Sequence, residues 1–224
     1  MKRSLIIKAL LLGIAIAVPA LYLSRLTPLN STSFPPKSLV THSIMALAAI
    51  ILAYRFSKGK LADYGFTRGS FRLKPTIFLW ALPTACLSVL RYVGVGSEET
   101  SFSTIIHDIL FIWIWASTCE EILTRGLLQS YLAPLRDRRV RIFWKWPTSI
   151  PVIFSALFFG SMHIVLVTKI GPAVIGPMVF ATGLGFVAGH YREKTGSLIP
   201  AILIHALFNV GGMLPFWILC GVLG

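Results

Sequence analysis

The sequence is poor in charged residues, which make up 13% of its 224 residues, whereas 55% are hydrophobic and the mean hydropathy is +0.77. A soluble domain does not have this composition. The chain is also too short for a membrane bundle followed by a folded soluble domain, and it shows no long linker or internal repeat. We therefore predict one all-α membrane domain over residues 1–224, with short loops.

Cysteine and acidic residues are scarce as well. The cysteines Cys86, Cys119 and Cys220 lie in apolar runs without paired spacing, which excludes a disulfide framework and a zinc knuckle. The sequence has 8 acidic and 21 basic residues, which gives a net charge of +13. Since the basic residues border apolar runs, attraction to anionic lipid head groups explains this charge better than nucleic-acid binding. No nucleic-acid partner, metal or cofactor is expected.

Apolar runs of about 20 residues, the length that crosses a bilayer, are abundant. They predict a polytopic bundle of seven or eight transmembrane helices, because a short apolar tail to Gly224 follows the seventh run. The fourth run is longer than a bilayer requires, so its end should protrude or tilt. The first run begins as a signal peptide does, but the charge pattern favours its retention. The predicted spans are residues 4–23, 38–56, 75–93, 102–132, 148–167, 172–190 and 197–214.

Basic residues gather in alternate loops of this predicted bundle. They lie near the amino terminus and in residues 55–74, 136–145 and 192–194. Because short cytoplasmic loops collect Lys and Arg, the amino terminus is predicted to be cytoplasmic. In the sixth run, Gly183, Gly185 and Gly189 predict close packing against neighbouring helices.

The fourth run carries two adjacent carboxylates, Glu120 and Glu121, followed by Arg125. A charge at the bilayer centre costs roughly 3 kcal/mol or more, so such residues face a bundle interior or a wet cavity and mark function. Glu121 and Arg125 are four residues apart and share a helix face, whereas Glu120 is rotated by about 100°. One carboxylate is therefore predicted to be neutralised while its neighbour stays free.

Two further runs contribute polar residues at a similar depth. His163 follows Phe159 by four residues in the fifth run, and His205 precedes Asn209 by four in the seventh. Counted from the cytoplasmic end of each span, the glutamates and both histidines lie roughly 13 to 18 Å into the membrane. Three helices are thus predicted to converge on one layer in the cytosolic half of the bilayer.

Carboxylates, imidazoles and an amide in a partly dry cavity suit the activation of water. A desolvated carboxylate can act as a general base, and imidazole and amide N–H groups can stabilise an oxyanion. No serine or cysteine lies in a nucleophile arrangement, so direct hydrolysis is the simpler chemistry. Two alternatives stay open. One is a non-enzymatic membrane scaffold or immunity protein, and the other a zinc-dependent hydrolase, although the sequence lacks the zincin motif.

Residues 100–213 resemble the CAAX-type intramembrane glutamic endopeptidases, also called the CPBP or Abi family. The resemblance rests on the order and spacing of three motifs and on the run from Gly196 to Pro200. Thr124 departs from the family pattern, where an aromatic residue is common. The motifs are Glu120-Glu121 with Arg125 and Gly126, Phe159 with His163, and His205 with Asn209.

This resemblance implies an α-helical membrane protease whose cavity opens to the cytosol. The expected reaction is cleavage of a peptide bond near the carboxyl end of a membrane-associated protein, prenylated or bearing a carboxyl-terminal sorting signal. Glu120 and His163 would activate water, and His205 and Asn209 would form the oxyanion site. Glu121 with Arg125 would order the catalytic helix or engage substrate. The compact chain favours a prokaryotic cytoplasmic membrane.

Overall fold

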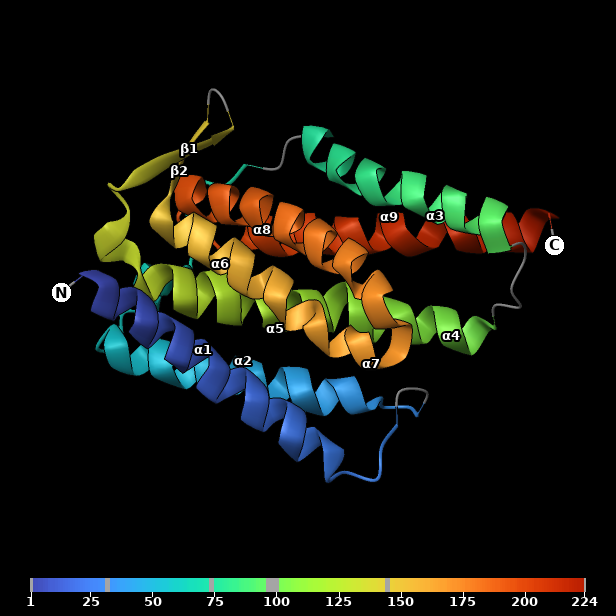
Figure 1. Cartoon of the computed structure of the whole chain (residues 1–224), viewed down its shortest axis with the longest axis horizontal. Coiled ribbons are helices and arrows are strands. Elements are labelled where there is room, and N and C mark those ends of the chain that lie inside the picture. Colours follow the sequence, from blue (N-terminus) through green and yellow to red (C-terminus); the bar gives the residue numbers. More distant parts are fainter. Residues whose placement is uncertain (1, 31–32, 73–74, 96–100, 144–145, 224) are drawn as a thin grey trace.

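The computed structural model describes residues 2–30, 33–72, 75–95, 101–143 and 146–223, which form an elongated helical bundle (Figure 1). The predicted all-α membrane bundle is confirmed, with one small hairpin added. The elements are α1 (Lys2–Arg25), α2 (Lys37–Phe56), η1 (Leu61–Tyr64), η2 (Pro75–Ala81), α3 (Leu82–Val95), α4 (Phe102–His107), η3 (Asp108–Ala116), α5 (Ser117–Glu121), η4 (Ile122–Gln129), η5 (Ala133–Leu135), β1 (Arg139–Phe143), β2 (Trp146–Ser149), α6 (Ile150–Met162), η6 (His163–Leu166), α7 (Val167–Ile170), η7 (Gly171–Val174), α8 (Ile175–Thr195) and α9 (Ile199–Leu223).

Five helical stretches in the described residues are long and apolar enough to cross a membrane. Two shorter apolar helices, residues 77–93 and 150–166, correspond to the third and fifth predicted spans. The apolar tail makes no eighth span, because residues 212–223 continue α9 past Pro215. A helix satisfies its backbone groups internally, which favours continuation in an apolar setting. The side of the membrane on which the amino terminus lies stays a prediction.

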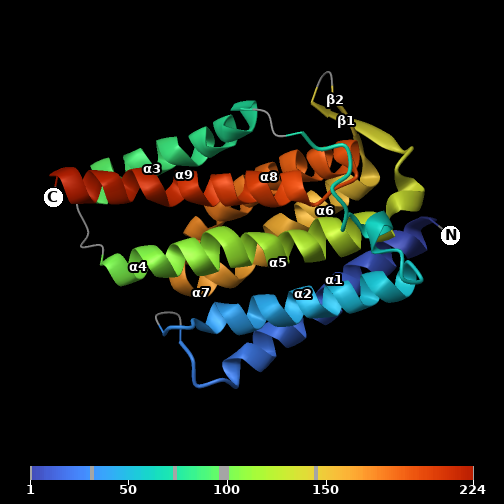
Figure 2. The same ribbon diagram turned by 180° about the vertical axis from the view of Figure 1, so that it is seen from behind.

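The fourth predicted span is one continuous helix built from four segments, α4, η3, α5 and η4. The segments η3 and η4 are π-helical, and they flank the short α5 turn that carries both glutamates. Such widened turns are rare and occur frequently at functional sites. Figure 2 shows this composite helix between the α1–α2 pair and the α8–α9 pair. The glutamates are therefore central in the bundle.

The sixth predicted span, α8, packs closely on α6, as two of its three glycines predict. A Cβ atom added to Gly185 would lie 2.7 Å from Ala156 Cα, and one added to Gly189 would lie 3.1 Å from Val152 Cγ1. Gly183 has nothing within 4 Å, so its predicted packing role is wrong. It lies two residues before Gly185, which rotates it by about 200° to a different helix face.

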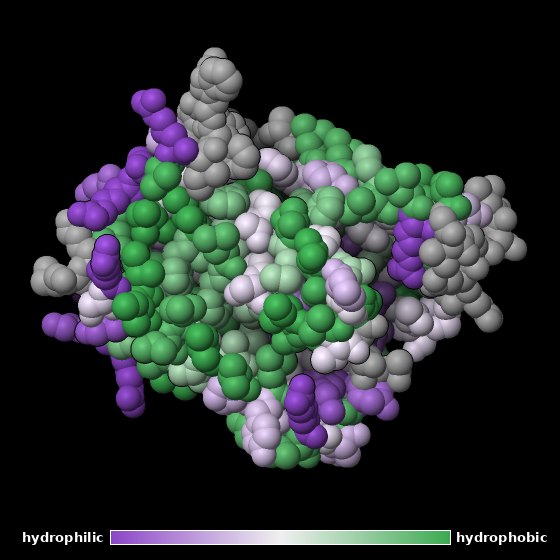
Figure 3. Space-filling view, viewed as in Figure 1, coloured by the Kyte–Doolittle hydropathy of each residue, from purple (hydrophilic) through white to green (hydrophobic). Residues whose placement is uncertain are grey.

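The basic stretch after η5 forms the antiparallel β1–β2 hairpin rather than a simple loop. Glu193 at the end of α8 anchors it, accepting hydrogen bonds from Arg139 at 3.0 Å and from Ser149. The hairpin and the amino terminus lie at the same end of the bundle (Figure 1). On the face in Figure 3, hydrophilic residues lie at this end, along the lower edge and near the opposite end, and apolar residues cover the middle, as expected for lipid contact.

Candidate active site

The buried half of the site is built around Glu121 and Arg125, whose side chains are fully buried. Arg125 Nη1 donates to Glu121 Oε1 at 2.8 Å, so the pair predicted from the four-residue spacing forms. The same nitrogen lies 2.6 Å from Thr124 Oγ1, which in turn donates to the Glu120 carbonyl oxygen. Thr124, the residue that departs from the family pattern, is thus part of the network. These bonds fix the turn that carries both carboxylates.

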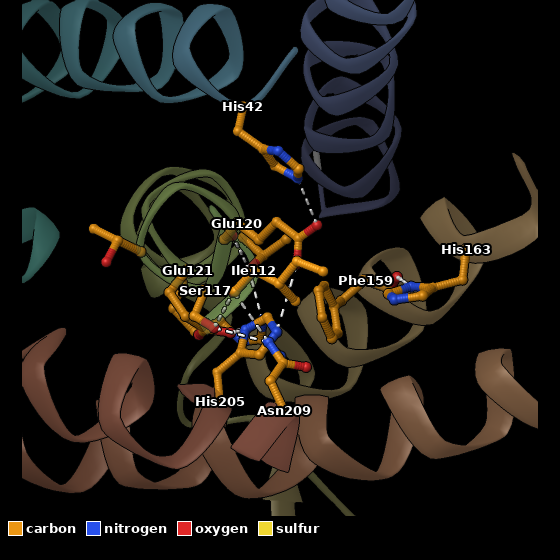
Figure 4. Close-up of polar contacts among 12 residues, drawn as sticks. His42, Ile112, Ser117, Glu120, Glu121, Phe159, His163, His205 and Asn209 are labelled. Carbon is orange, nitrogen blue, oxygen red and sulfur yellow. Dashed lines mark hydrogen bonds and ion pairs between the residues drawn. The ribbon is translucent and has the colours of Figure 1, made fainter. Parts of the chain in front are cut away.

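Glu120 points to the other side of the helix, and its side chain is 16% exposed. Its Oε1 lies 3.1 Å from His42 Nε2, and its Oε2 lies 3.6 Å from His205 Nε2 (Figure 4). The first distance is a hydrogen bond and the second is slightly too long for one. Glu120 therefore keeps a partly accessible carboxylate between two imidazoles, in contrast to the sequestered Glu121.

His205 lies between the two carboxylates. Its side chain is 4% exposed, and its Nδ1 lies 3.0 Å from Glu121 Oε1. Asn209, one turn further along α9, donates from Nδ2 to Ser117 Oγ at 3.0 Å and to the Ile112 carbonyl at 3.3 Å. The predicted convergence of α9 with the glutamate helix is therefore confirmed. In this structure the Asn209 amide is bound to that helix.

His163 joins the site through its contact with Phe159. It begins η6 where the α-helix α6 ends, and its Nδ1 lies 3.1 Å from the Phe159 carbonyl oxygen. Because that oxygen only accepts, Nδ1 carries the proton and Nε2 of the neutral ring is free to accept one. Among the described residues, no hydrogen bond or ion pair joins His163 to Glu120, and Figure 4 shows its ring beyond Phe159.

Phe159 connects the parts of the site. Its side chain is fully buried, and its ring makes edge-to-face contacts with His163 at 5.1 Å and His205 at 5.2 Å between centroids. The Arg125 guanidinium carbon lies 4.7 Å from the same ring centre. This packing gives a physical reason for a phenylalanine four residues before His163, since one ring contacts the guanidinium and both imidazoles.

His42 is the site residue that the sequence prediction missed. It lies in α2, 78 residues before Glu120 and close to the start of the predicted span of residues 38–56. The depth of His42 in its predicted span did point to the site. His42 lies 14 residues before Phe56, or about 21 Å along a helix, only slightly deeper than the depths predicted for the other site residues. The same depth count, applied to the second span, would have placed it near the site.

Residues 102–211 match the family model described as type II CAAX prenyl endopeptidase, Rce1-like. That range begins with α4, ends in α9 and contains Glu120, Glu121, Arg125, His163, His205 and Asn209. Residues 102–211 belong to this family of CAAX-type endopeptidases. The resemblance inferred from the three motifs is therefore confirmed, and His42 lies outside the matched range. Neither the curated proteins nor the solved structures include a match to the chain.

The CAAX-type endopeptidase family is a protease family. Here its glutamate motif and its His205 and Asn209 motif lie on helices long and apolar enough to cross a membrane, and Phe159 and His163 lie on the shorter apolar helix of residues 150–166. The chain is thus an integral membrane protein with a hydrolase-family core. Within the ranges that the structure describes, no group of three or more His, Cys, Asp or Glu side chains is arranged to hold a metal ion.

Proposed function

We propose that this protein is an intramembrane glutamic endopeptidase. Its substrate would be a membrane-associated protein, prenylated or bearing a carboxyl-terminal sorting signal, cut near its carboxyl end. We place it in a prokaryotic cytoplasmic membrane with the site open to the cytosol. The observation that carries the proposal is that two adjacent carboxylates have different partners and different exposure. Glu121 is locked to Arg125 and His205, whereas Glu120 is partly accessible between two imidazoles.

In this mechanism Glu120 takes a proton from water while the water oxygen bonds to the scissile carbonyl carbon. The carbonyl π electrons move to oxygen, and N–H groups stabilise the resulting oxyanion. Collapse of this intermediate breaks the C–N bond, and the proton held by Glu120 passes to the leaving amine. The products are a carboxylic acid and an amine, which exchange a proton to give a carboxylate and an ammonium group, with no covalent enzyme intermediate. A general base of this kind contributes about 10²- to 10⁴-fold in rate.

The other site residues take supporting roles in this proposal. His163, with Nδ1 bound to a backbone carbonyl, presents Nε2 to orient the attacking water. Asn209 supplies an amide N–H donor for the oxyanion, and His205 supplies a second from Nε2 when its ring carries both protons, because Nδ1 already donates to Glu121. Asn209 would exchange its bonds to Ser117 and Ile112 for the oxyanion when substrate binds. Glu121 and Arg125 hold the catalytic helix in register.

The proposal is tested by cleavage assays in liposomes with the purified protein. The panel contains a prenylated CAAX peptide and single-span peptides with varied carboxyl-terminal tails. We expect the wild type to cut at least one of them, with full activity in a chelator. We expect Glu120→Gln to lose this cleavage. Asp108→Asn is the matched control for Glu120→Gln, because the Asp108 carboxylate lies on the same helix and pairs with His107 outside the cluster.

Two alternatives predict different outcomes. A scaffold or immunity protein would cut no peptide of the panel and would keep its biological function in Glu120→Gln. A zinc-dependent hydrolase would lose activity in chelator and regain it with added zinc. Cleavage that requires Glu120 and persists in chelator contradicts both of these alternatives.

A further inference from the structure

The contact between His42 and Glu120 carries an inference that rests on the proposed function. We infer that His42 is the charged partner of Glu120, holding that carboxylate ionised and fixing its orientation. It is a positioning residue, since it acts on substrate through Glu120. With Oε1 bound to His42, Oε2 accepts no hydrogen bond from the part of the chain that the structure describes. That oxygen is the one directed to the reacting water.

The hydrogen bonds of the His42 ring fix where its protons lie. Nδ1 is 2.7 Å from the Ser38 carbonyl oxygen, which can only accept, so Nδ1 carries a proton. The 3.1 Å bond between Nε2 and Glu120 Oε1 then needs a further proton, because a neutral ring and an ionised carboxylate would present two acceptors. The pair therefore holds one proton beyond a neutral imidazole and a carboxylate.

The surrounding charges place that proton on the imidazole. Two carboxylates, Glu120 and Glu121, lie in the cluster, and Arg125 is already bound to Glu121 at 2.8 Å. His205 gives one ring nitrogen to Glu121 and holds the other 3.6 Å from Glu120. An imidazolium at His42 gives the second carboxylate its own cation. Charges at membrane depth are retained when paired, so this arrangement is the balanced one.

The same geometry explains how His42 would be positioned for this role. It lies in the second turn of α2, and its bond to Ser38 lies within that helix, so the ring orientation is fixed before it meets Glu120. Its side chain is 16% exposed, as is that of Glu120. A hydrogen bond between two charged groups is stronger than one between neutral groups. The α2 helix, outside the family match, thereby completes the site.

The first test compares cleavage kinetics of His42→Phe and His42→Gln with the wild type on a peptide that the wild type cuts. His42→Phe keeps ring volume and loses the donor, so we expect kcat to fall about 10- to 150-fold. We expect KM to stay within about twofold, because His42 does not touch substrate. His42→Gln keeps a neutral N–H donor without the charge, and its kcat should lie between the two.

His107→Gln is the matched control, since His107 also pairs with a carboxylate, Asp108, at 2.9 Å. We expect its kinetics to match the wild type. The inference is overturned if His42→Phe keeps a kcat within about twofold of the wild type, or if its loss appears only in KM.

The second test needs no substrate and therefore separates this inference from the proposed function. Infrared spectra report the carbonyl stretch of protonated carboxylic acids. We expect no such band from Glu120 in the wild type, and a new one in His42→Gln or His42→Phe that disappears when Glu120→Gln is added. A Glu120-dependent band already present in the wild type would overturn the inference, even if cleavage is observed. The expected spectra without any cleavage would uphold the charge pairing and count against the protease.

Discussion

Replacement of Arg125 by methionine tests the buried half of the site most sharply. Arg125 is fully buried, pairs with Glu121 at 2.8 Å and stacks over the Phe159 ring. Removing one partner of a buried ion pair leaves an uncompensated charge and typically costs 3–5 kcal/mol. Because His205 also binds Glu121, we expect Arg125→Met to lower the free energy of unfolding by about 3 kcal/mol, the lower end of that range.

The assay is unfolding of purified protein in mixed micelles, followed by helical circular dichroism as denaturing detergent is added. The double variant with Glu121→Gln should recover at least about 1 kcal/mol, because it removes the unpaired charge. Arg91→Met is the matched control. Arg91 lies 4.1 Å over the Phe216 ring and is exposed, so its loss should cost less than that of the fully buried Arg125. A loss below about 1 kcal/mol for Arg125→Met, with additive effects in the double variant, would refute the reasoning.

Three further predictions concern packing and protonation. Gly65 has φ +91°, and a Cβ there would lie 2.5 Å from Arg192 Nε. Gly65→Ala should therefore lower the free energy of unfolding by about 1–3 kcal/mol in the same assay. Gly221→Ala is the control, because a Cβ at Gly221 meets nothing within 4 Å. Phe159→Ala should cost about 3–5 kcal/mol and remove activity, because this buried ring supports both imidazoles; retained activity would show that the ring is dispensable. Burial raises the pKa of the Tyr64 hydroxyl above its ordinary value of 10.0, so the unfolded chain loses this proton at a lower pH than the folded protein. The free energy of unfolding should therefore fall as the pH rises above 10. Tyr64→Phe should flatten that fall, and an unchanged pH slope would contradict the assignment.

Features with a short sequence period were predictable. Apolar run lengths predicted the apolar helices, and four-residue spacings predicted the Glu121–Arg125 pair and the shared face of His205 and Asn209. These depend on helix geometry alone, which the local sequence determines. The continuation of α9 to Leu223 was harder to predict, because a proline usually interrupts a helix and Pro215 lies inside this one.

Features set by tertiary packing were not predictable in the same way. The His42–Glu120 bond joins residues 78 positions apart, and the contact between α2 and the glutamate helix leaves no local pattern. His163 lies at the junction of α6 and η6, so its ring direction depends on where that helix ends. The hairpin of β1 and β2 is anchored by Glu193, a residue of another element. Long-range contacts of this kind override local patterns.

The most direct test of the account compares Glu120→Gln with Glu121→Gln in one preparation, measuring cleavage and unfolding of each. We predict that Glu120→Gln lowers kcat by about 10²- to 10⁴-fold and leaves the free energy of unfolding within about 1 kcal/mol of the wild type. Glu121→Gln should instead destabilise the protein, because it leaves the Arg125 charge buried without its carboxylate. Its folded fraction should still cut substrate. The opposite division, with Glu120→Gln active and Glu121→Gln stable but inactive, would contradict the assignment of Glu120 as the base.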